Sequence, residues 1–128
     1  MIHLDTSILI DALTGPRRSA AALRAAIAAG ERLAVTSLVL YEWRRGPRQE
    51  AELAVQDRLL PSTTAIAFDA TAAARAAALY RTLKRPRGRE LDLAIAACAL
   101  VHDASFWTLN VDDFKDIPEL VLYRPESS

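Results

Sequence analysis

The sequence contains a single cysteine, four glycines and no net charge, and these shortages exclude several classes of protein. Cys98 cannot form an internal disulfide, and its place in the apolar run "ELDLAIAACAL" (residues 90–100) predicts a small buried hydrophobic side chain. No GxGxxG or P-loop pattern is present, which argues against dinucleotide and nucleoside-triphosphate binding. The zero net charge removes any overall electrostatic case for a nucleic-acid partner, so that case must rest on local patches.

Long apolar stretches are missing as well. No window reaches the roughly 18 apolar residues of a membrane-spanning helix, and the N-terminus has neither a basic leader nor a long apolar segment. We therefore expect a cytoplasmic protein with no membrane partner. His3 and His102 have no spaced cysteine or histidine partner, so a zinc site is unsupported and a packed or surface histidine is the default interpretation.

The sequence does contain enough apolar material for a core. Its 128 residues, 52% of them hydrophobic, predict one domain over residues 1–128, with residues 125–128 as a frayed tail. Short apolar strands alternating with helices indicate an α/β fold with a mainly parallel central sheet flanked by helices. The predicted strands cover residues 2–5, 32–37, 65–69, 105–109 and 120–124. One predicted helix starts after Asp5, and a second ends near Gly30. Four more predicted helices cover residues 38–46, 48–61, 70–85 and 90–102.

Acidic and amide side chains follow the predicted strands. Asp5 ends the first strand, Glu42 lies in the helix after the second, and Asp92 opens a helix that leads to a later strand. The segment "TLNVDDF" (residues 108–114) follows that later strand. Because the functional crevice of a parallel sheet lies beyond the carboxyl ends of its strands, we expect these segments to gather at one edge of the sheet.

Most of these acids also have an explanation that requires no ligand. Asp5 would cap the next helix through its carboxylate. Asp92 in a first helical turn would interact favourably with the helix dipole, typically by about 0.3–1 kcal/mol. Asn110, Asp112 and Asp113 would shape a turn.

Glu42 is harder to explain without a partner. It lies in "SLVLYEWRRG" among Leu38, Leu40, Tyr41 and Trp43, where a solvated glutamate is less expected. A partly buried carboxylate needs a compensating charge, and a cation would supply it. The alternative is a salt bridge to a nearby arginine.

Taken together, "HLDTSILID", "SLVLYEWRRG", "ELDLAIAACAL" and "TLNVDDF" resemble the PIN-domain ribonucleases, specifically the VapC-type toxins of bacterial toxin–antitoxin pairs. No single motif is specific, but the ordered set is, and it runs through nearly the whole chain. The resemblance implies a PIN-like (Rossmann-like) three-layer fold and Mg²⁺- or Mn²⁺-dependent endonuclease activity on RNA. It also implies a homodimer and a cognate VapB-type antitoxin, whose C-terminal segment would lie in a groove near the active site.

The resemblance assigns roles to particular positions. Asp5, Glu42 and Asp92 match the first three acids of the family, and Thr6 and Ser7 match the hydroxyl positions after the first acid. On this basis we predict that Asp5 and Asp92 are the principal metal ligands. Glu42 would bind the metal directly or orient the attacking water.

The fourth acid of the family has several candidates. The Thr-x-Asn/Asp segment of the family falls on Thr108 and Asn110, and its Asp-Phe pair falls on Asp113 and Phe114. Asparagine stands at position 110, where many relatives carry aspartate, so Asn110, Asp112 and Asp113 are all left open as the completing residue. This segment would hold a second metal or an ordered water.

Metal chemistry supports the assignment from the residue types alone. Hard divalent cations prefer oxygen ligands, and magnesium takes one or two carboxylates together with water and substrate phosphate. Carboxylates crowded together without a metal repel and raise the pKa of one another. A metal removes that repulsion and lowers the pKa of a bound water.

Basic residues lie on both sides of the proposed acidic site. One run comes just before the acids of the helix at 90–102, and another comes just after Glu42. Such runs are commonly solvated faces, but cations at this place would offset the repulsion between an acidic site and RNA. The residues expected to contact the RNA phosphates are Arg44, Arg45, Arg85, Arg87 and Arg89.

Two other functions deserve comparison. A PIN-like RNA- or protein-binding module without catalysis is permitted by Asn110, but retention of the three other acids argues against it. A phosphatase or phosphoacceptor built on Asp5 would need a second aspartate two residues later, where this chain has Ser7, or a lysine after a late strand. The metal-dependent ribonuclease is therefore the leading hypothesis.

Overall fold

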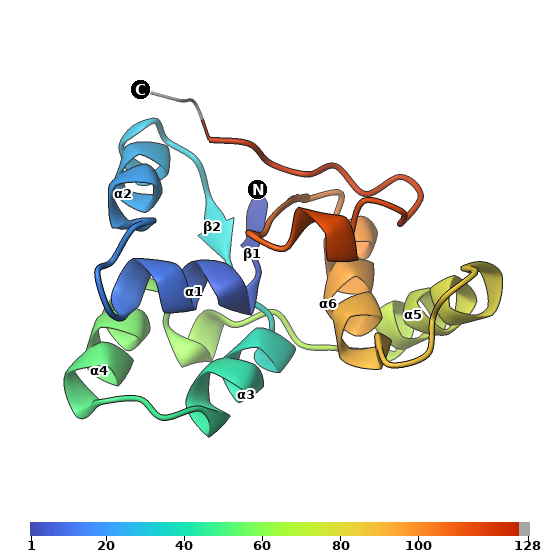
Figure 1. Ribbon diagram of the computed structural model, residues 1–128, viewed down its shortest axis with the longest axis horizontal. Helices are drawn as coiled ribbons and strands as arrows, with labels where there is room; N and C mark the ends of the chain where they lie inside the picture. The colour runs from blue at the N-terminus through green and yellow to red at the C-terminus, as the bar shows by residue number, and fades with distance from the viewer. Residues whose placement is uncertain (126–128) are drawn as a thin grey trace.

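A computed structural model, which describes residues 1–125, has three short parallel strands at its centre (Figure 1). Strand β1 (Ile2–Leu4) lies between β2 (Leu33–Ala34) and β3 (Ser105–Trp107), so the strand order is β2-β1-β3. The expected parallel sheet is confirmed. Because the strands run in the same direction, their carboxyl ends meet at one edge, and Asp5 follows β1 at that edge.

The outer edges of the sheet are shorter than the sequence predicts. The segments around Ile66 and Leu122 form single bridges, to Thr36 and Phe106 respectively, so the predictions of full strands at these two places are wrong. Each segment has a neighbour on one side only, and a turn comes shortly before it. A 3-10 turn precedes Ile66, and Glu119, with a φ of 69°, precedes Leu122.

Helices cover the strands, and all of the predicted helices are confirmed with slightly different ends. Local chemistry sets several starts: Thr36 accepts a hydrogen bond from the Val39 amide, and Asp69 accepts one from the Ala72 amide. Within residues 1–125 the α-helices are α1 (Thr6–Leu13), α2 (Ala20–Ala28), α3 (Ser37–Arg45), α4 (Glu50–Leu59), α5 (Ala70–Thr82) and α6 (Glu90–Val101).

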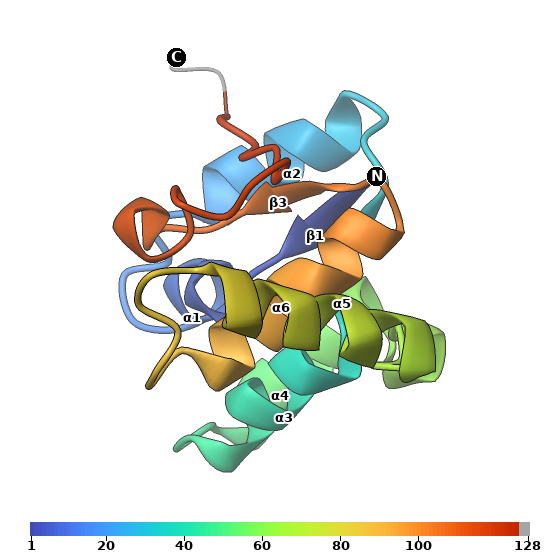
Figure 2. The same cartoon turned by 90° about the vertical axis from the view of Figure 1, so that its right-hand side faces the viewer.

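The strands lie between helices on two sides, which gives the three layers expected for this fold. Figure 2 shows α2 on one side of β1 and β3, with α6 directly on the other side and α5 packed outside α6. Helices α3 and α4 lie next to α1, below the sheet in both views (Figures 1 and 2). Helix α1 therefore starts at the sheet edge and runs outward beneath it.

Helix α6 is the most deeply buried element. Every residue from Leu93 to Ala99 is buried, because the helix packs against α5, α3 and β3 at once. Small alanines in α5 and α6 allow the two helices to approach closely. Cys98 is fully buried, as predicted, and burial raises the pKa of its thiol to about 11. Asp92 stands one residue before this buried segment, at the mouth of the helix.

Two further expectations concern the surface and the histidines. No helix in the described part of the chain has the length and apolar character needed to cross a membrane. His3 is a packed histidine, only 1% exposed, and its ring lies 5.8 Å from that of His102.

Candidate metal centre

Asp5 lies directly after β1 and before α1, and its side chain is almost completely buried. It occupies the N-cap position of α1, yet its carboxylate accepts no capping hydrogen bond from that helix. Its Oδ2 atom instead accepts hydrogen bonds from Ser7 Oγ at 2.9 Å and from Thr108 Oγ1 at 2.6 Å. The helix-cap explanation of Asp5 is therefore wrong, and Oδ1 accepts no hydrogen bond from residues 1–125.

The two hydroxyl groups are themselves fixed by the loop after β3. Ser7 Oγ accepts a hydrogen bond from the Leu109 amide at 3.1 Å, and Thr108 Oγ1 accepts one from the Asn110 amide at 2.9 Å. Each hydroxyl carries one proton, and both protons point to Asp5. The 3.3 Å contact between the two hydroxyl oxygens consequently adds no further donor. This network joins the ends of β1 and β3 around one carboxylate.

Glu42 is held mainly by a hydroxyl and only weakly by an arginine. Thr6 donates a 2.7 Å hydrogen bond to Glu42 Oε1. The sequence suggested a salt bridge to a nearby arginine, and in the structure that arginine is Arg45. Its Nη2 lies 3.7 Å from Glu42 Oε2, and the Arg45 side chain is 56% exposed. An exposed pair at that distance contributes little to stability. Because Glu42 is 21% exposed, a cation at the mouth of the site can still reach it.

The environment of Asp92 opposes its negative charge. Burial is the largest cause that raises its pKa, to about 6, and the charges of Asp5, Glu42 and Asp113 raise it further. Arg89 acts in the opposite direction but does not compensate. The N-terminus of α6 would lower the pKa of an acid in its first turn, so burial and acidic neighbours outweigh the dipole here. This is the behaviour of carboxylates that lack a cation.

The three candidates in the segment after β3 lie in different surroundings. Asn110 is exposed, and its backbone is tied into the turn by hydrogen bonds to Thr108 and Asp113. Asp112 points to solvent and pairs with Lys115 at 3.0 Å. Asp113 acts on the pKa of Asp92. The charge of Asp113 is therefore felt at Asp92, whereas Asp112 pairs with Lys115, and the identity of the completing residue stays a prediction.

The donor set fits an open site better than a closed cage. Within residues 1–125, no three acidic, histidine or cysteine side chains are arranged to hold one ion by themselves. Magnesium is commonly bound through one or two carboxylates, with water and phosphate oxygens completing the octahedron. The free Oδ1 of Asp5 and the destabilised charge of Asp92 suit that mode of binding.

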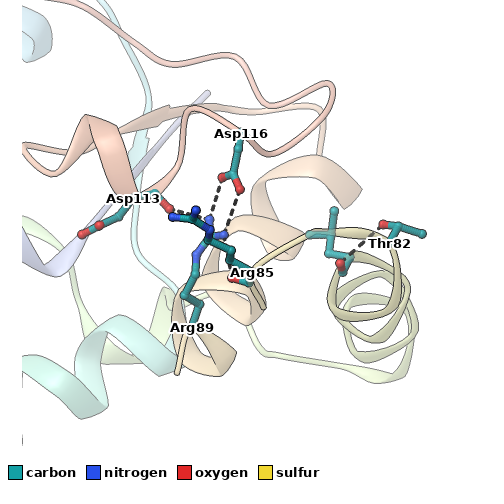
Figure 3. A network of polar contacts seen from close by, with 6 residues as sticks. Thr82, Arg85, Arg89, Asp113 and Asp116 are labelled. Carbon is teal, nitrogen blue, oxygen red and sulfur yellow. Dashed lines mark hydrogen bonds and ion pairs between the residues drawn. The ribbon is translucent and has the colours of Figure 1, made fainter. Parts of the chain in front are cut away.

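The basic residues differ in how free they are. Arg44 donates to Ser62 at 2.8 Å, and the Arg45 guanidinium lies 5.1 Å from the centre of the Tyr41 ring. Arg85 and Arg87 are exposed. The Arg89 side chain is 19% exposed, and Figure 3 shows its contacts with Asp116 and with the backbone of Asp113 and Arg85. The phosphate-contact role remains a prediction for all five arginines, and the structure gives Arg89 a different set of partners.

The chain is similar in sequence to known proteins over nearly its whole length. The sequence profile of the PIN domain matches residues 2–120, a range that contains every acid described above. The chain belongs to the PIN-domain family. Ribonuclease VapC19 of Mycobacterium tuberculosis is 36% identical to it over 120 residues, which make up 91% of this chain and 94% of that protein. The resemblance to VapC-type chains is thereby confirmed.

Solved structures of similar fold agree with the assignment of this chain to the PIN-domain family. One is described as VapBC2 from Rickettsia felis bound to a DNA fragment from their promoter; its matching chain has a TM-score of 0.77 and 26% identity, covering 98% of this chain and 100% of that one. A toxin–antitoxin complex from Klebsiella pneumoniae matches with a TM-score of 0.74, 26% identity and the same coverage. The predicted PIN-like architecture is confirmed.

In this PIN domain, sequence reasoning missed Asp116. Asp116 pairs with Arg89. The sequence does not predict this contact, because a single aspartate in a loop has no pattern that indicates its partner. Thr6, Ser7 and Thr108, which were expected to support the acids, do so through hydrogen bonds to Glu42 and Asp5.

Proposed function

We propose that this PIN domain is a metal-dependent endoribonuclease toxin of a toxin–antitoxin pair. The observation that carries the proposal is the gathering of Asp5, Glu42, Asp92 and Asp113 from four separate segments, in an environment that raises the pKa of Asp92. The similarity to a protein named Ribonuclease VapC19 supports RNA as the substrate class. A binding module would have no need for carboxylates that destabilise one another.

The acids have distinct tasks in this proposal. Asp5 and Asp92 would bind Mg²⁺ or Mn²⁺. A bound ion of this kind would lower the pKa of a bound water and neutralise charge on the phosphodiester. Ser7 and Thr108 direct both of their protons to Oδ2 of Asp5, and this leaves Oδ1 as the oxygen that would bind the ion. Glu42, fixed by Thr6, would bind the ion or accept a proton from the attacking water. Asp113 would hold an ordered water or a second ion.

The exposed arginines would bring RNA to this acidic site. Arg44 and Arg45 follow Glu42 on α3, and Arg85 and Arg87 precede α6. Cations on two sides of the acids would contact phosphates that flank the cleaved bond and offset the repulsion from the carboxylates. Arg45 is already within cation–π distance of the exposed Tyr41 ring, at 5.1 Å from its centre.

An antitoxin would bind the groove beneath α1. This groove, of about 290 Å³, lies between α1, α2 and α4, and its apolar lining includes Leu13, Leu23, Val55 and Leu59. Helix α1 starts beside Asp5 and ends at the groove, so the two sites are separated by one short helix of about 12 Å. An antitoxin segment that continues from the groove along α1 would reach the acids. Two solved relatives are toxin–antitoxin complexes, which supports this partner class, and a homodimer remains part of the proposal.

Purified protein and a mixture of structured and unstructured RNAs test the proposed activity. We expect cleavage with Mg²⁺ or Mn²⁺, none with EDTA, and none by the Asp5→Asn variant. Sequencing of the new RNA ends would then identify the target. Intact RNA after incubation of folded wild-type protein with either metal would contradict the proposal.

A further inference from the structure

Arg89, the residue immediately before α6, contacts three other residues at once (Figure 3). Its Nη1 and Nη2 atoms donate to the two carboxylate oxygens of Asp116 at 2.9 and 2.6 Å. Nη2 also donates to the backbone carbonyl of Asp113 at 2.8 Å, and Nη1 donates to the carbonyl of Arg85 at 3.1 Å. Both terminal nitrogens are therefore fully engaged within the protein.

The pair is more than an incidental surface ion pair. The Arg89 side chain is only 19% exposed, and the two-pronged geometry with Asp116 matches the fork of the guanidinium to the two carboxylate oxygens. Hydrogen bonding to Asp116 raises the pKa of Arg89, and hydrogen bonding to Arg89 lowers the pKa of Asp116. Each group therefore stabilises the charged form of the other.

The pair fastens the loop after β3 to the start of α6. Asp113 and Asp116 lie on that loop, and Asp92 lies in the first turn of α6, three residues after Arg89. The bond from Arg89 to the Asp113 carbonyl holds the backbone of one of the candidate residues for completing the acidic group. Asp113 and Asp92 belong to the two elements that the pair joins, and the charge of Asp113 raises the pKa of Asp92.

We propose that Arg89 and Asp116 form a latch that positions Asp113 beside Asp92, so that Arg89 is a positioning residue and not a contact for RNA phosphate. The inference rests on the proposed function for its catalytic consequence. It differs from the sequence-based expectation for Arg89, because both terminal nitrogens already donate to Asp116 and to a carbonyl, so the two-pronged face of the guanidinium is not open to a phosphate. The neighbouring Arg85 and Arg87 side chains keep that capacity.

Two variants separate the latch from a phosphate contact. Arg89→Lys keeps the charge but loses the fork, since an ammonium cannot bridge two carboxylate oxygens and a carbonyl in the same way. Asp116→Asn removes the negative charge and one of the two acceptor oxygens, so it breaks the two-pronged pair and loosens the hold on Arg89. The matched control is Arg75→Lys, in the exposed pair between Arg75 and Glu119 (2.7 Å), which lies outside the acidic site.

Hydrogen exchange on metal-free, RNA-free protein reports on the latch directly. We expect both latch variants to lose amide protection in residues 109–117 while Leu93 to Ala99 in α6 stay protected, and we expect Arg75→Lys to lose none at these places. With RNA and Mn²⁺, we expect kcat to fall about tenfold to a hundredfold in both latch variants, with KM for RNA changed less than about threefold.

The outcomes distinguish this inference from the proposed function. Unchanged protection of residues 109–117 in both variants would overturn the latch. Cleavage by wild-type protein together with tighter RNA binding and full kcat in Asp116→Asn would also overturn it, since that is the behaviour of a freed phosphate contact. If wild-type protein cleaves no RNA, the proposed function fails, and the exchange data still decide whether the latch exists.

Discussion

Thr108 donates a 2.6 Å hydrogen bond to the carboxylate of Asp5, although 103 residues separate the two positions in the sequence. The bond joins the carboxyl ends of the neighbouring strands β3 and β1, and the Asp5 amide strengthens this junction through a 2.9 Å bond to the Trp107 carbonyl. Because the Thr108 hydroxyl hydrogen-bonds to Oδ2 of Asp5, it leaves Oδ1 as the carboxylate oxygen that is available to a ligand. This relationship is the geometric basis of the proposed metal centre.

Replacement of Thr108 with valine preserves its shape but removes the proton that it donates to Asp5. A hydrogen bond to a charged group contributes about 1.5–3 kcal/mol, so we expect a lower free energy of unfolding by an amount in this range and a cleavage rate at least about tenfold lower. Thr108→Ser keeps the hydroxyl and should retain most of the activity. Denaturant unfolding and cleavage assays measure both effects, and equal activity of the valine and serine variants would contradict the account.

Asp92→Asn should stabilise the metal-free protein while it abolishes activity. The pKa of Asp92 is raised to about 6 in the folded state from 3.8, so the unfolded state releases its proton first. The charged form therefore opposes folding by an amount that grows between about pH 3.8 and 6 and is constant above, and the neutral amide should raise the free energy of unfolding by about 1–3 kcal/mol at pH 7.5. Most of this gain should disappear at pH 4.

Thermal unfolding without metal, at both pH values, checks the prediction for Asp92. Glu31→Gln, a substitution of an exposed acid outside the site, is the control and should change stability little. A destabilised Asp92→Asn variant at pH 7.5 would show that Asp92 is stabilised by its surroundings, contrary to the proposed role.

His3 should limit the stability of the protein in acid. Burial lowers its pKa to about 4, with smaller contributions from His102 and the N-terminal ammonium, and both of its ring nitrogens lack a hydrogen-bond partner in the described residues. Between about pH 4 and 6.5 the unfolded chain thus binds a proton that the folded chain does not, and stability falls as the pH falls. His3→Leu should recover about 1–2 kcal/mol at pH 5 relative to its effect at pH 7.5. Parallel stability curves for the two proteins would contradict this.

Arg87 is expected to contribute one phosphate contact. In EDTA, where RNA stays intact, Arg87→Ala should weaken binding and reduce the slope of log K against log salt by about 0.7, the value for one phosphate of a single strand. Arg58→Ala on α4 is the matched control, an exposed arginine of another surface, and should leave the slope unchanged. An unaltered slope in Arg87→Ala would remove this residue from the RNA-binding surface.

Much of the fold and site could be predicted because the signals were local or followed from strand order. Asp5, Glu42 and Asp92 each follow or lead an apolar element, and parallel pairing then brings them to the same edge. The cap residues Thr36 and Asp69 likewise act within four positions of their own chain. The spacing of apolar residues was sufficient to predict the positions of the helices, because each helix buries either one apolar face or all of its surface.

Other features depended on long-range contacts that no local pattern encodes. Ile66 and Leu122 have strand-like neighbours, but at the edge of the sheet each makes a single bridge because turns interrupt the pairing. Arg89 looked like any other member of a basic run, and only the approach of Asp116 from 27 residues away gives it a different partner. The different surroundings of Asp112, which pairs with Lys115, and of Asp113, whose charge raises the pKa of Asp92, also depend on the fold of the turn.

Binding of Mn²⁺, followed by electron paramagnetic resonance, tests the central claim that these distant carboxylates hold one divalent cation. We predict saturable binding to the wild-type protein, at least about tenfold weaker binding to Asp5→Asn and Asp92→Asn, and unchanged binding to Glu31→Gln. Equal Mn²⁺ affinity in all four proteins would contradict the claim.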